Sequence, residues 1–296
     1  MKSVRRIWNR IVEFVIEKAI FLAGILSIVF VVLIFVFLLK EGLSLFKEYS
    51  PLAFLFGTKW YPISHPPSFG IVPLLLGSVV VTLGSIVIAV PLGVGAAIYV
   101  GEVAPVWLRE ILKATVEFLA AIPSIVLGFI GLVTLVPLVK QVFHLQTGLT
   151  AISGSIMLAF MAMPTIVSMM EDALRAVPSS YRYGAIALGA TRWQTIWRVM
   201  LPAASSGMLA AVMLGIGRVI GETMAVMMIT GNAAGIPTSL MQPVRTMTAT
   251  IAAEMGEAVQ GSDHYFSLFA IGIVLFIITF AINLTAAFFI NRRSKA

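Results

Sequence analysis

The sequence contains no cysteine and three histidines, and only 11% of its 296 residues are charged. The absence of cysteine excludes disulfides, thiolate metal sites and cysteine nucleophiles. A soluble domain usually carries about 25% charged residues, so this chain has too few to cover a globule of its size. Since 59% of its residues are hydrophobic, the composition indicates an all-α integral membrane protein.

The chain also lacks a Gly-Lys dipeptide, and with it the G-x-x-x-x-G-K-[ST] loop that holds nucleotide phosphates. If the protein uses ATP, a second chain must bind it. The net charge of +7 does not indicate nucleic-acid binding, because the basic residues lie in short segments between apolar runs. We therefore expect this chain to bind no cofactor, metal ion or nucleic acid.

Six apolar segments are long enough to cross a bilayer, which takes about 20 residues. The first is longer than the apolar part of a signal peptide, which has about 7–15 residues, so we expect it to be retained. Apolar residues before it share one helical face, which predicts a surface amphipathic helix over residues 1–18. The six predicted spans are 19–39, 71–100, 118–139, 149–170, 206–230 and 265–290.

The distribution of basic residues predicts the orientation. With both chain ends in the cytoplasm (N-in/C-in), the inner segments contain 14 Lys and Arg residues and the outer segments 5. Such an excess is typical of cytoplasmic segments. The predicted organisation is a cytoplasmic surface helix (1–18), a first span (19–39), an extracytoplasmic segment (40–70), a core of five spans (71–290) and a basic cytoplasmic tail (291–296).

The longest cytoplasmic loop, residues 171–202, has the pattern of two short helices separated by a glycine. Pro178 ends the preceding helix, and either of the two serines that follow it can cap the next helix. Gly189 suits the left-handed residue that ends this helix. Thr191 and Gln194 form a capping box for the second helix, and its apolar face consists of Trp193, Ile196, Trp197 and Met200.

Two opposite charges occupy the middle of the fifth span, where residues 217–226 read GRVIGETMAV. A charge at the centre of a membrane helix costs about 2.5–3.5 kcal/mol on insertion scales, so Arg218 and Glu222 need a partner or an aqueous path. One interpretation is an internal ion pair that stabilises the bundle. The other is a translocation path, in which Arg218, Glu222 and Thr223 contact the transported substrate.

Two glycines flank this pair with the G-x-x-x-G spacing. Small residues allow helices to approach closely in membranes. Gly217 and Gly221 are therefore predicted to pack the fifth span against a helix of a second, similar chain.

Several stretches resemble the permease subunits of ABC-type phosphate importers of the Pst type. The segment around Trp60 before the second span is similar to the C-type subunit of that family. The matching stretches are FGTKWYP (56–62), VPLGVGAAIYVGEVAP (90–105), AIPSIVLGFIGL (121–132), ALGATRWQTIWRVMLPAA (187–204), GRVIGETMAVMMITGN (217–232) and PVRTMTATIAAEMGEA (243–258).

The resemblance implies a type I ABC importer permease fold in a bacterial or archaeal inner (plasma) membrane, surrounded by lipid. It implies three protein partners: a second homologous permease subunit, a cytoplasmic ABC ATPase dimer and an extracytoplasmic phosphate-binding protein. ATP and Mg would be used by the ATPase, so this chain is not itself an enzyme.

The loop 171–202 resembles the EAA loop of such permeases, which seats a coupling helix in a cleft of the ATPase. The family's Glu-Ala-Ala falls on Tyr183, Gly184 and Ala185, so the family's glutamate is absent here. The family's glycine falls on Gly189, and its Leu-Pro falls on Leu201 and Pro202. The resemblance thus assigns ATPase coupling to Tyr183, Gly184, Ala185, Gly189, Ala190, Thr191, Leu201 and Pro202.

Other functions remain open from the residues alone. An autonomous secondary transporter or channel could use Arg218 and Glu222 for coupling, but it would not need the cytoplasmic loop. A membrane-embedded enzyme needs clustered acids, nucleophiles or metal ligands, and these two charged residues are too few. Among importers, molybdate, tungstate and sulfate are alternative substrates, because one arginine does not distinguish tetrahedral oxyanions.

Overall fold

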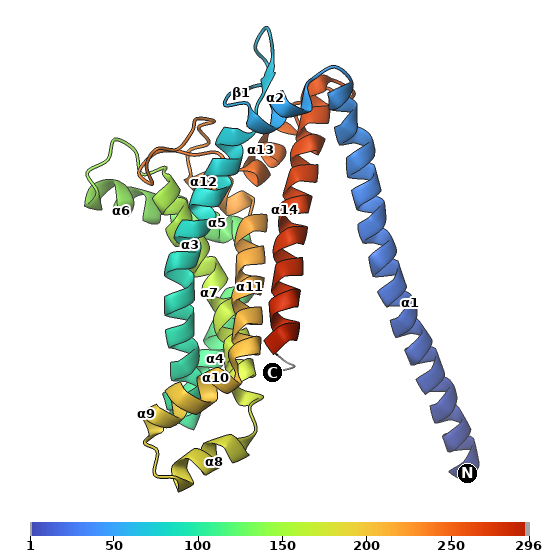
Figure 1. Cartoon of the computed structure of the whole chain (residues 1–296), viewed down its shortest axis with the longest axis vertical. Coiled ribbons are helices and arrows are strands. Elements are labelled where there is room, and N and C mark those ends of the chain that lie inside the picture. Colours follow the sequence, from blue (N-terminus) through green and yellow to red (C-terminus); the bar gives the residue numbers. More distant parts are fainter. Residues whose placement is uncertain (1, 294–296) are drawn as a thin grey trace.

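The computed structural model describes the backbone of residues 2–293; for residues 2–12, 286 and 289–293 it describes the backbone only. The described chain is almost entirely helical, and Figure 1 shows its long helices running between two ends of the molecule. One end carries the loop predicted to be cytoplasmic, and we call it the inner end. The opposite, outer end carries a small hairpin (Figure 1).

Within residues 2–293, five helical stretches are long and apolar enough to cross a membrane, and a bent pair, Arg192–Ala203 with Ser205–Gly221, makes a sixth when it is counted as one span. They correspond to the six predicted spans. The first helix begins, and the last one ends, toward the inner end (Figure 1), as the N-in/C-in prediction requires. The five are Glu13–Lys47, Val72–Val103, Ser124–Val142, Ala151–Arg175 and Asp263–Thr285.

The first helix, α1 (Lys2–Gly42), is continuous over 41 residues. The separate surface helix predicted for residues 1–18 is therefore not formed by the described backbone: neither glycine nor proline lies between residues 2 and 23 to bend the helix. At about 1.5 Å per residue, α1 is about 60 Å long, twice the roughly 30 Å thickness of a bilayer core. It can cross the bilayer and continue beyond it, whereas the apolar face predicted before residue 13 lies outside the described side chains.

The first and last helices meet near the outer end. Phe35 of α1 stacks on Phe276 of α14 (Asp263–Arg293) at 4.6 Å between ring centroids, and Phe37 meets Phe269 edge to face. Toward its beginning, α1 diverges from α14 (Figure 1), and its apolar side chains are exposed, as on a helix that faces lipid. Residues 291–293 of the predicted basic tail belong to α14, and residues 294–296 lie outside the described chain.

Three helices form the core: α3 (Val72–Ile98), α7 (Ala151–Arg175) and α11 (Ser205–Gly221). Gly84 and Gly93 of α3 face α7 so closely that a Cβ at either position would lie within 3.0 Å of an α7 side chain. Small residues let membrane helices approach in this way. A short π-helical turn, η2 (Tyr99–Val103), follows α3 at the inner end.

The third span begins later than predicted. Residues 118–121 belong to α4 (Val106–Ala121), and the backbone is extended at Ile122 and Pro123. The residue before a proline disfavours the helical conformation, so the chain breaks there. The span then consists of α5 (Ser124–Val133) and α6 (Leu135–Val142).

The outer end is built from short elements held together by one carboxylate. Glu254 accepts hydrogen bonds from the Trp60 indole at 3.1 and 3.2 Å, pairs with Arg245 at 2.6 Å and contacts His264 at 2.9 Å. These contacts join residues far apart in the sequence. The short elements at the outer end are η1 (Leu43–Lys47), α2 (Pro51–Phe56), the antiparallel hairpin of β1 (Trp60–Tyr61) and β2 (Ser68–Phe69), and α13 (Met247–Glu254).

The inner end consists of two helical arms around a glycine turn. The second arm has a π-helical middle, runs through Pro202 and bends by 70° into α11. Pro202 is accommodated within this arm because a proline at the start of a helical turn needs no N–H partner. The inner elements are α8 (Ser179–Ala187), α9 (Arg192–Thr195), η3 (Ile196–Met200) and α10 (Leu201–Ala203).

Candidate translocation path and coupling loop

The fifth span is broken at its charged segment. The helix α11 ends at Gly221, Glu222 is extended with ψ 131°, and α12 (Met224–Ile229) begins two residues later. The prediction of one continuous helix over 206–230, with both charges on one face, was therefore wrong. Glycine has a low helix propensity, and the Glu222 carboxylate stabilises the break by accepting the Ala225 N–H at 3.2 Å.

The backbone freed by this break is satisfied from the outer helix α13. Thr248 donates its hydroxyl to the carbonyl oxygen of Glu222 at 2.9 Å. Thr223 donates its own hydroxyl to the carbonyl oxygen of Gly221 at 3.2 Å. Non-helical backbone at membrane depth requires such partners, so the break is part of the packed structure.

Arg218 contacts the neighbouring helix and not the acidic residue four positions further on. Its Nη1 donates a hydrogen bond to Thr165 Oγ1 of α7 at 2.9 Å. Among the described residues Arg218 and Glu222 form no ion pair with each other; the Glu222 carboxylate accepts the Ala225 N–H, and the Glu222 carbonyl accepts the Thr248 hydroxyl. The contact between Arg218 and Glu222 that the ion-pair interpretation requires is therefore not formed. The guanidinium instead has a neutral partner in the middle of an apolar span.

Neither glycine of the G-x-x-x-G pattern makes a close helix contact with the described part of this chain. A Cβ at Gly217 or Gly221 would find no atom within 4 Å. The close approach inside the chain occurs instead at Gly215, where a Cβ would lie 2.6 Å from the Ile166 side chain of α7. The predicted packing of Gly217 and Gly221 against a second permease chain stays a prediction, for which this face is open.

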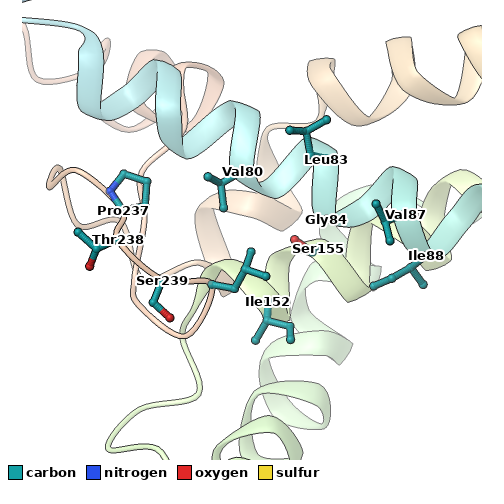
Figure 2. Close-up of a pocket in the computed structure, with 11 residues that line it drawn as sticks. Val80, Leu83, Gly84, Val87, Ile88, Ile152, Ser155, Pro237, Thr238 and Ser239 are labelled. Atoms are coloured by element: carbon teal, nitrogen blue, oxygen red, sulfur yellow. The ribbon is translucent and has the colours of Figure 1, made fainter.

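A cavity of about 570 Å³ lies between α3, the start of α7 and the loop 237–240. In Figure 2 the loop residues Pro237, Thr238 and Ser239 lie opposite Val80 of α3. The lining contains no charged side chain, and the Ser155 hydroxyl is already bonded to backbone carbonyls of the chain. Because an anion would lose its hydration there without gaining a cation, this cavity does not suit an oxyanion.

The inner loop has the predicted turn and cap. Gly189 has φ +82°, the left-handed conformation expected for it. Thr191 accepts the Gln194 N–H at 3.3 Å, and the Gln194 side chain accepts the Thr191 N–H at 2.9 Å, which completes the capping box. The serine cap of α8 was wrong, because Pro178 takes the N-cap position and no side chain bonds the first turn.

The residues assigned to ATPase coupling are distributed over both arms and the turn. Tyr183 and its neighbour Gly184 are exposed, whereas Ala185 is buried. Ala190 is half-buried and Thr191 exposed, and in the second arm Leu201 is half-buried and Pro202 exposed.

The predicted apolar face of the second arm divides into two sides. Ile196 and Met200 are buried against the bundle, whereas Trp193 and Trp197 are exposed. Tyr183 and Leu188 are exposed as well, and we refer to these four exposed side chains of the inner loop as the inner apolar surface.

Two groups of charged residues connect the inner loop and its surroundings to the bundle. Glu102 of η2 binds Arg182 of α8, with its two carboxylate oxygens 2.5 and 2.6 Å from the same Nη2. On the other side, Lys113 of α4 bonds Glu171 at 3.1 Å and Asp172 at 3.2 Å. These hydrogen bonds raise the pKa of Lys113, so its amine stays protonated at neutral pH.

Residues 89–295 match the family described as the inner membrane component of binding-protein-dependent transport systems. The chain belongs to this family. The permease is 40% identical to a probable ABC transporter permease of Bacillus subtilis over 88% of its own length and 85% of the relative. It is 38% identical to the phosphate transport system permease PstC of Mesorhizobium japonicum over 81% and 78%, and 35% identical to PstC of Xylella fastidiosa over 82% and 80%.

Solved structures show the same fold. The permease matches a chain of the methionine transporter MetNI with a TM-score of 0.56 at 23% identity, over 76% of its length and 94% of that chain. It matches a chain of a bacterial alginate ABC transporter with a TM-score of 0.62 at 16% identity, over 91% and 93%. The resemblance to a C-type permease and the prediction of a type I ABC importer permease fold in the inner membrane are thus confirmed.

Two contacts of the permease were missed by sequence reasoning. Thr165, the partner of Arg218, follows Pro164 in an apolar helix and carries no charge that would single it out. Glu102 stands at the end of the second span, at the same end of the molecule as the arginine-rich inner loop. An acidic residue in that position could have suggested an ion pair with the loop.

Proposed function

We propose that this permease is the transmembrane subunit of an ATP-driven importer of inorganic phosphate and forms one half of its translocation path. Two relatives at 35% and 38% identity are phosphate transport system permeases, which supports the substrate class. The inner membrane location and the family supply the transport role. The path itself is argued from the broken fifth span.

The observation that carries the proposal is the unpaired guanidinium of Arg218. A cation in the middle of a membrane helix is costly, and among the described residues the bonded partner of Arg218 is the neutral Thr165 hydroxyl. Guanidinium binds tetrahedral oxyanions through its planar fork of N–H donors. Phosphate passing the break would supply the missing negative charge for a short time.

Glu222 and Thr223 complete the proposed path. Both lie at the break, where the helix is open and the backbone is held by Thr248 of the outer helix α13. The Glu222 carboxylate repels the anion and so limits its affinity, because transport requires an anion that leaves. Thr223 provides a hydroxyl beside the path.

The inner loop is the proposed docking element for a cytoplasmic ABC ATPase dimer. Its inner apolar surface, formed by Tyr183, Leu188, Trp193 and Trp197, lies beyond the membrane-spanning part of the bundle and is uncovered in this chain. Large apolar side chains exposed together indicate a protein contact. ATP and Mg would be bound by the ATPase, because this chain lacks a nucleotide loop.

Two further partners belong to the proposal. A second, homologous permease would pack on the open face of Gly217 and Gly221, where a neighbouring helix can approach closely. An extracytoplasmic phosphate-binding protein would dock at the outer end and deliver the anion.

The test is radiolabelled phosphate uptake by proteoliposomes that contain the assembled complex, with binding protein outside and ATP inside. The proposal expects uptake that needs ATP and is not reduced by excess sulfate, molybdate or tungstate. Uptake of one of these anions in place of phosphate would refute the proposal that phosphate is the substrate. ATP hydrolysis by this chain purified alone would refute its role as a subunit that depends on a partner ATPase.

A further inference from the structure

The inner end of α3 presents a buried carboxylate to the inner loop. Glu102 lies in the π-helical turn η2, and its side chain is 6% exposed. Both carboxylate oxygens lie within hydrogen-bond distance of Arg182 Nη2, at 2.5 and 2.6 Å. Arg182 belongs to α8, the first arm of the loop. The charged pair therefore joins two elements that are 80 residues apart in the sequence.

The same residue also holds the second arm. Arg192, the first residue of α9, donates from Nη2 to the backbone carbonyl oxygen of Glu102 and, at 3.5 Å, to that of Val103. Carbonyls at the C-terminal end of a helix carry partial negative charge, so they suit a guanidinium. Glu102 thus contacts the first arm through its side chain and the second arm through its backbone.

The helix that carries Glu102 reaches the outer end of the molecule. At the beginning of α3, the Ser78 hydroxyl accepts the N–H of Met247, the first residue of α13, at 2.9 Å. Next in that helix, Thr248 holds the carbonyl of Glu222 at the break. One continuous helical stretch, Val72–Val103, therefore lies between the inner loop and the elements that support the proposed path.

We infer that Glu102 is a positioning residue that fixes both arms of the inner loop to α3, so that a movement of the loop reaches the translocation path. The role rests on the proposed function of that loop. When the Glu102–Arg182 pair is broken, the first arm can move without displacing α3, while Arg192 still bonds the backbone carbonyl of Glu102.

The first test measures the position of the loop and needs no transport activity. The chain has no cysteine, so Ser180→Cys on the first arm and Val87→Cys on α3, both exposed, can carry spin labels in the assembled complex. We expect Glu102→Gln to broaden the distribution of distances between the labels. The matched control is Glu110→Gln, an exposed glutamate of α4, which should leave the distribution unchanged. Equal distributions in the two variants would overturn the inference.

The second test measures phosphate imported per ATP hydrolysed in proteoliposomes. A purely structural role would lower uptake and hydrolysis together and leave this ratio unchanged. We expect Glu102→Gln to keep the ATPase bound but to lower the ratio about tenfold, the scale of losing one charge-assisted hydrogen bond. An unchanged ratio, with bound ATPase, would overturn the positioning role.

A second variant covers the case in which Glu102→Gln impairs assembly because it leaves the Arg182 charge without its partner. The double variant Glu102→Gln with Arg182→Gln removes both charges and should assemble with the same lowered ratio. Recovery of the wild-type ratio in the double variant would overturn the inference. If instead the wild-type complex binds no ATPase, the proposed function fails, while the label distances still decide whether Glu102 positions the loop.

Discussion

Arg218 of α11 donates a hydrogen bond to Thr165 of α7 at 2.9 Å, across two helices of the core. The contact sets the direction of a guanidinium that has no acidic partner. Because the Glu222 carboxylate accepts the Ala225 N–H at the break, the two charged side chains make separate contacts. Variants of Arg218 and Glu222 should therefore differ in their effects.

Arg218→Gln should abolish phosphate uptake and leave the complex assembled. No ion pair is broken by this change, so no buried carboxylate is stranded, and the anion loses its cation in the span. Arg218→Lys should recover little uptake, because an ammonium lacks the planar fork. Uptake of labelled phosphate is measured beside the yield of the purified complex.

The double variant Arg218→Gln with Glu222→Gln is the control for this prediction. If the two charges matter only to each other, removing both restores transport. We expect assembly without uptake, and recovered uptake would contradict the role of Arg218 in the path.

Thr165→Val should raise the KM for phosphate delivered by the binding protein about fivefold, the scale of about 1 kcal/mol for a lost hydrogen bond. Valine has nearly the same shape but cannot accept the N–H of Arg218. Thr165→Ser keeps the hydroxyl and should retain wild-type uptake. If the valine variant transports as well as the serine variant, the guanidinium does not need this contact.

Gly189→Leu should prevent association of the ATPase while the chain still inserts into the membrane. Gly189 has φ +82°, a conformation that costs a residue with a Cβ about 1–2 kcal/mol. Asparagine tolerates this conformation better, so Gly189→Asn is the matched control and should keep the ATPase. Co-purification of the subunits measures the outcome, and a wild-type ratio in the leucine variant would show that the turn is not required.

Gly217→Leu should prevent the second permease chain from joining the complex. The side chain would meet no atom within this chain but would fill the open face of α11. Gly24→Leu places the same side chain on α1, where the space is also open, and should have no effect. The measurement is native mass spectrometry of the solubilised complex, in which normal pairing of the Gly217 variant would exclude this face as the contact.

Glu254→Ala should loosen the outer hairpin without unfolding the bundle. The variant loses the contacts of one carboxylate to Trp60, Arg245 and His264, and a lost hydrogen bond to a charged group costs about 1.5–3 kcal/mol. We expect faster amide hydrogen exchange in residues 60–69 and unchanged exchange in α7. Glu257→Ala, on the same side of the molecule, is the control; equal exchange in both variants would exclude Glu254 as the residue that holds the hairpin.

Local features of the structure could be predicted because their causes lie within a few residues. The spans follow from the length of apolar runs, and the orientation follows from the basic residues between them. Gly189 adopts the left-handed turn because glycine does so without steric cost, and Thr191 with Gln194 forms its capping box within a single turn. The motifs of the inner loop and the fifth span were sufficient to recognise the family.

The contacts that give the charged residues their roles depend on residues brought together by the fold. Sequence spacing places Glu222 one turn after Arg218, but the helix ends at Gly221, where the Glu222 carboxylate accepts the Ala225 N–H and the Thr248 hydroxyl bonds the Glu222 carbonyl. Thr165 and Glu102 lie 53 and 80 residues from the arginines that they bind. The sequence by itself determined a six-span permease with a cytoplasmic loop; only the packing of α3, α7 and α11 decided which partner each charge has, because hydrogen bonds between helices depend on their relative placement.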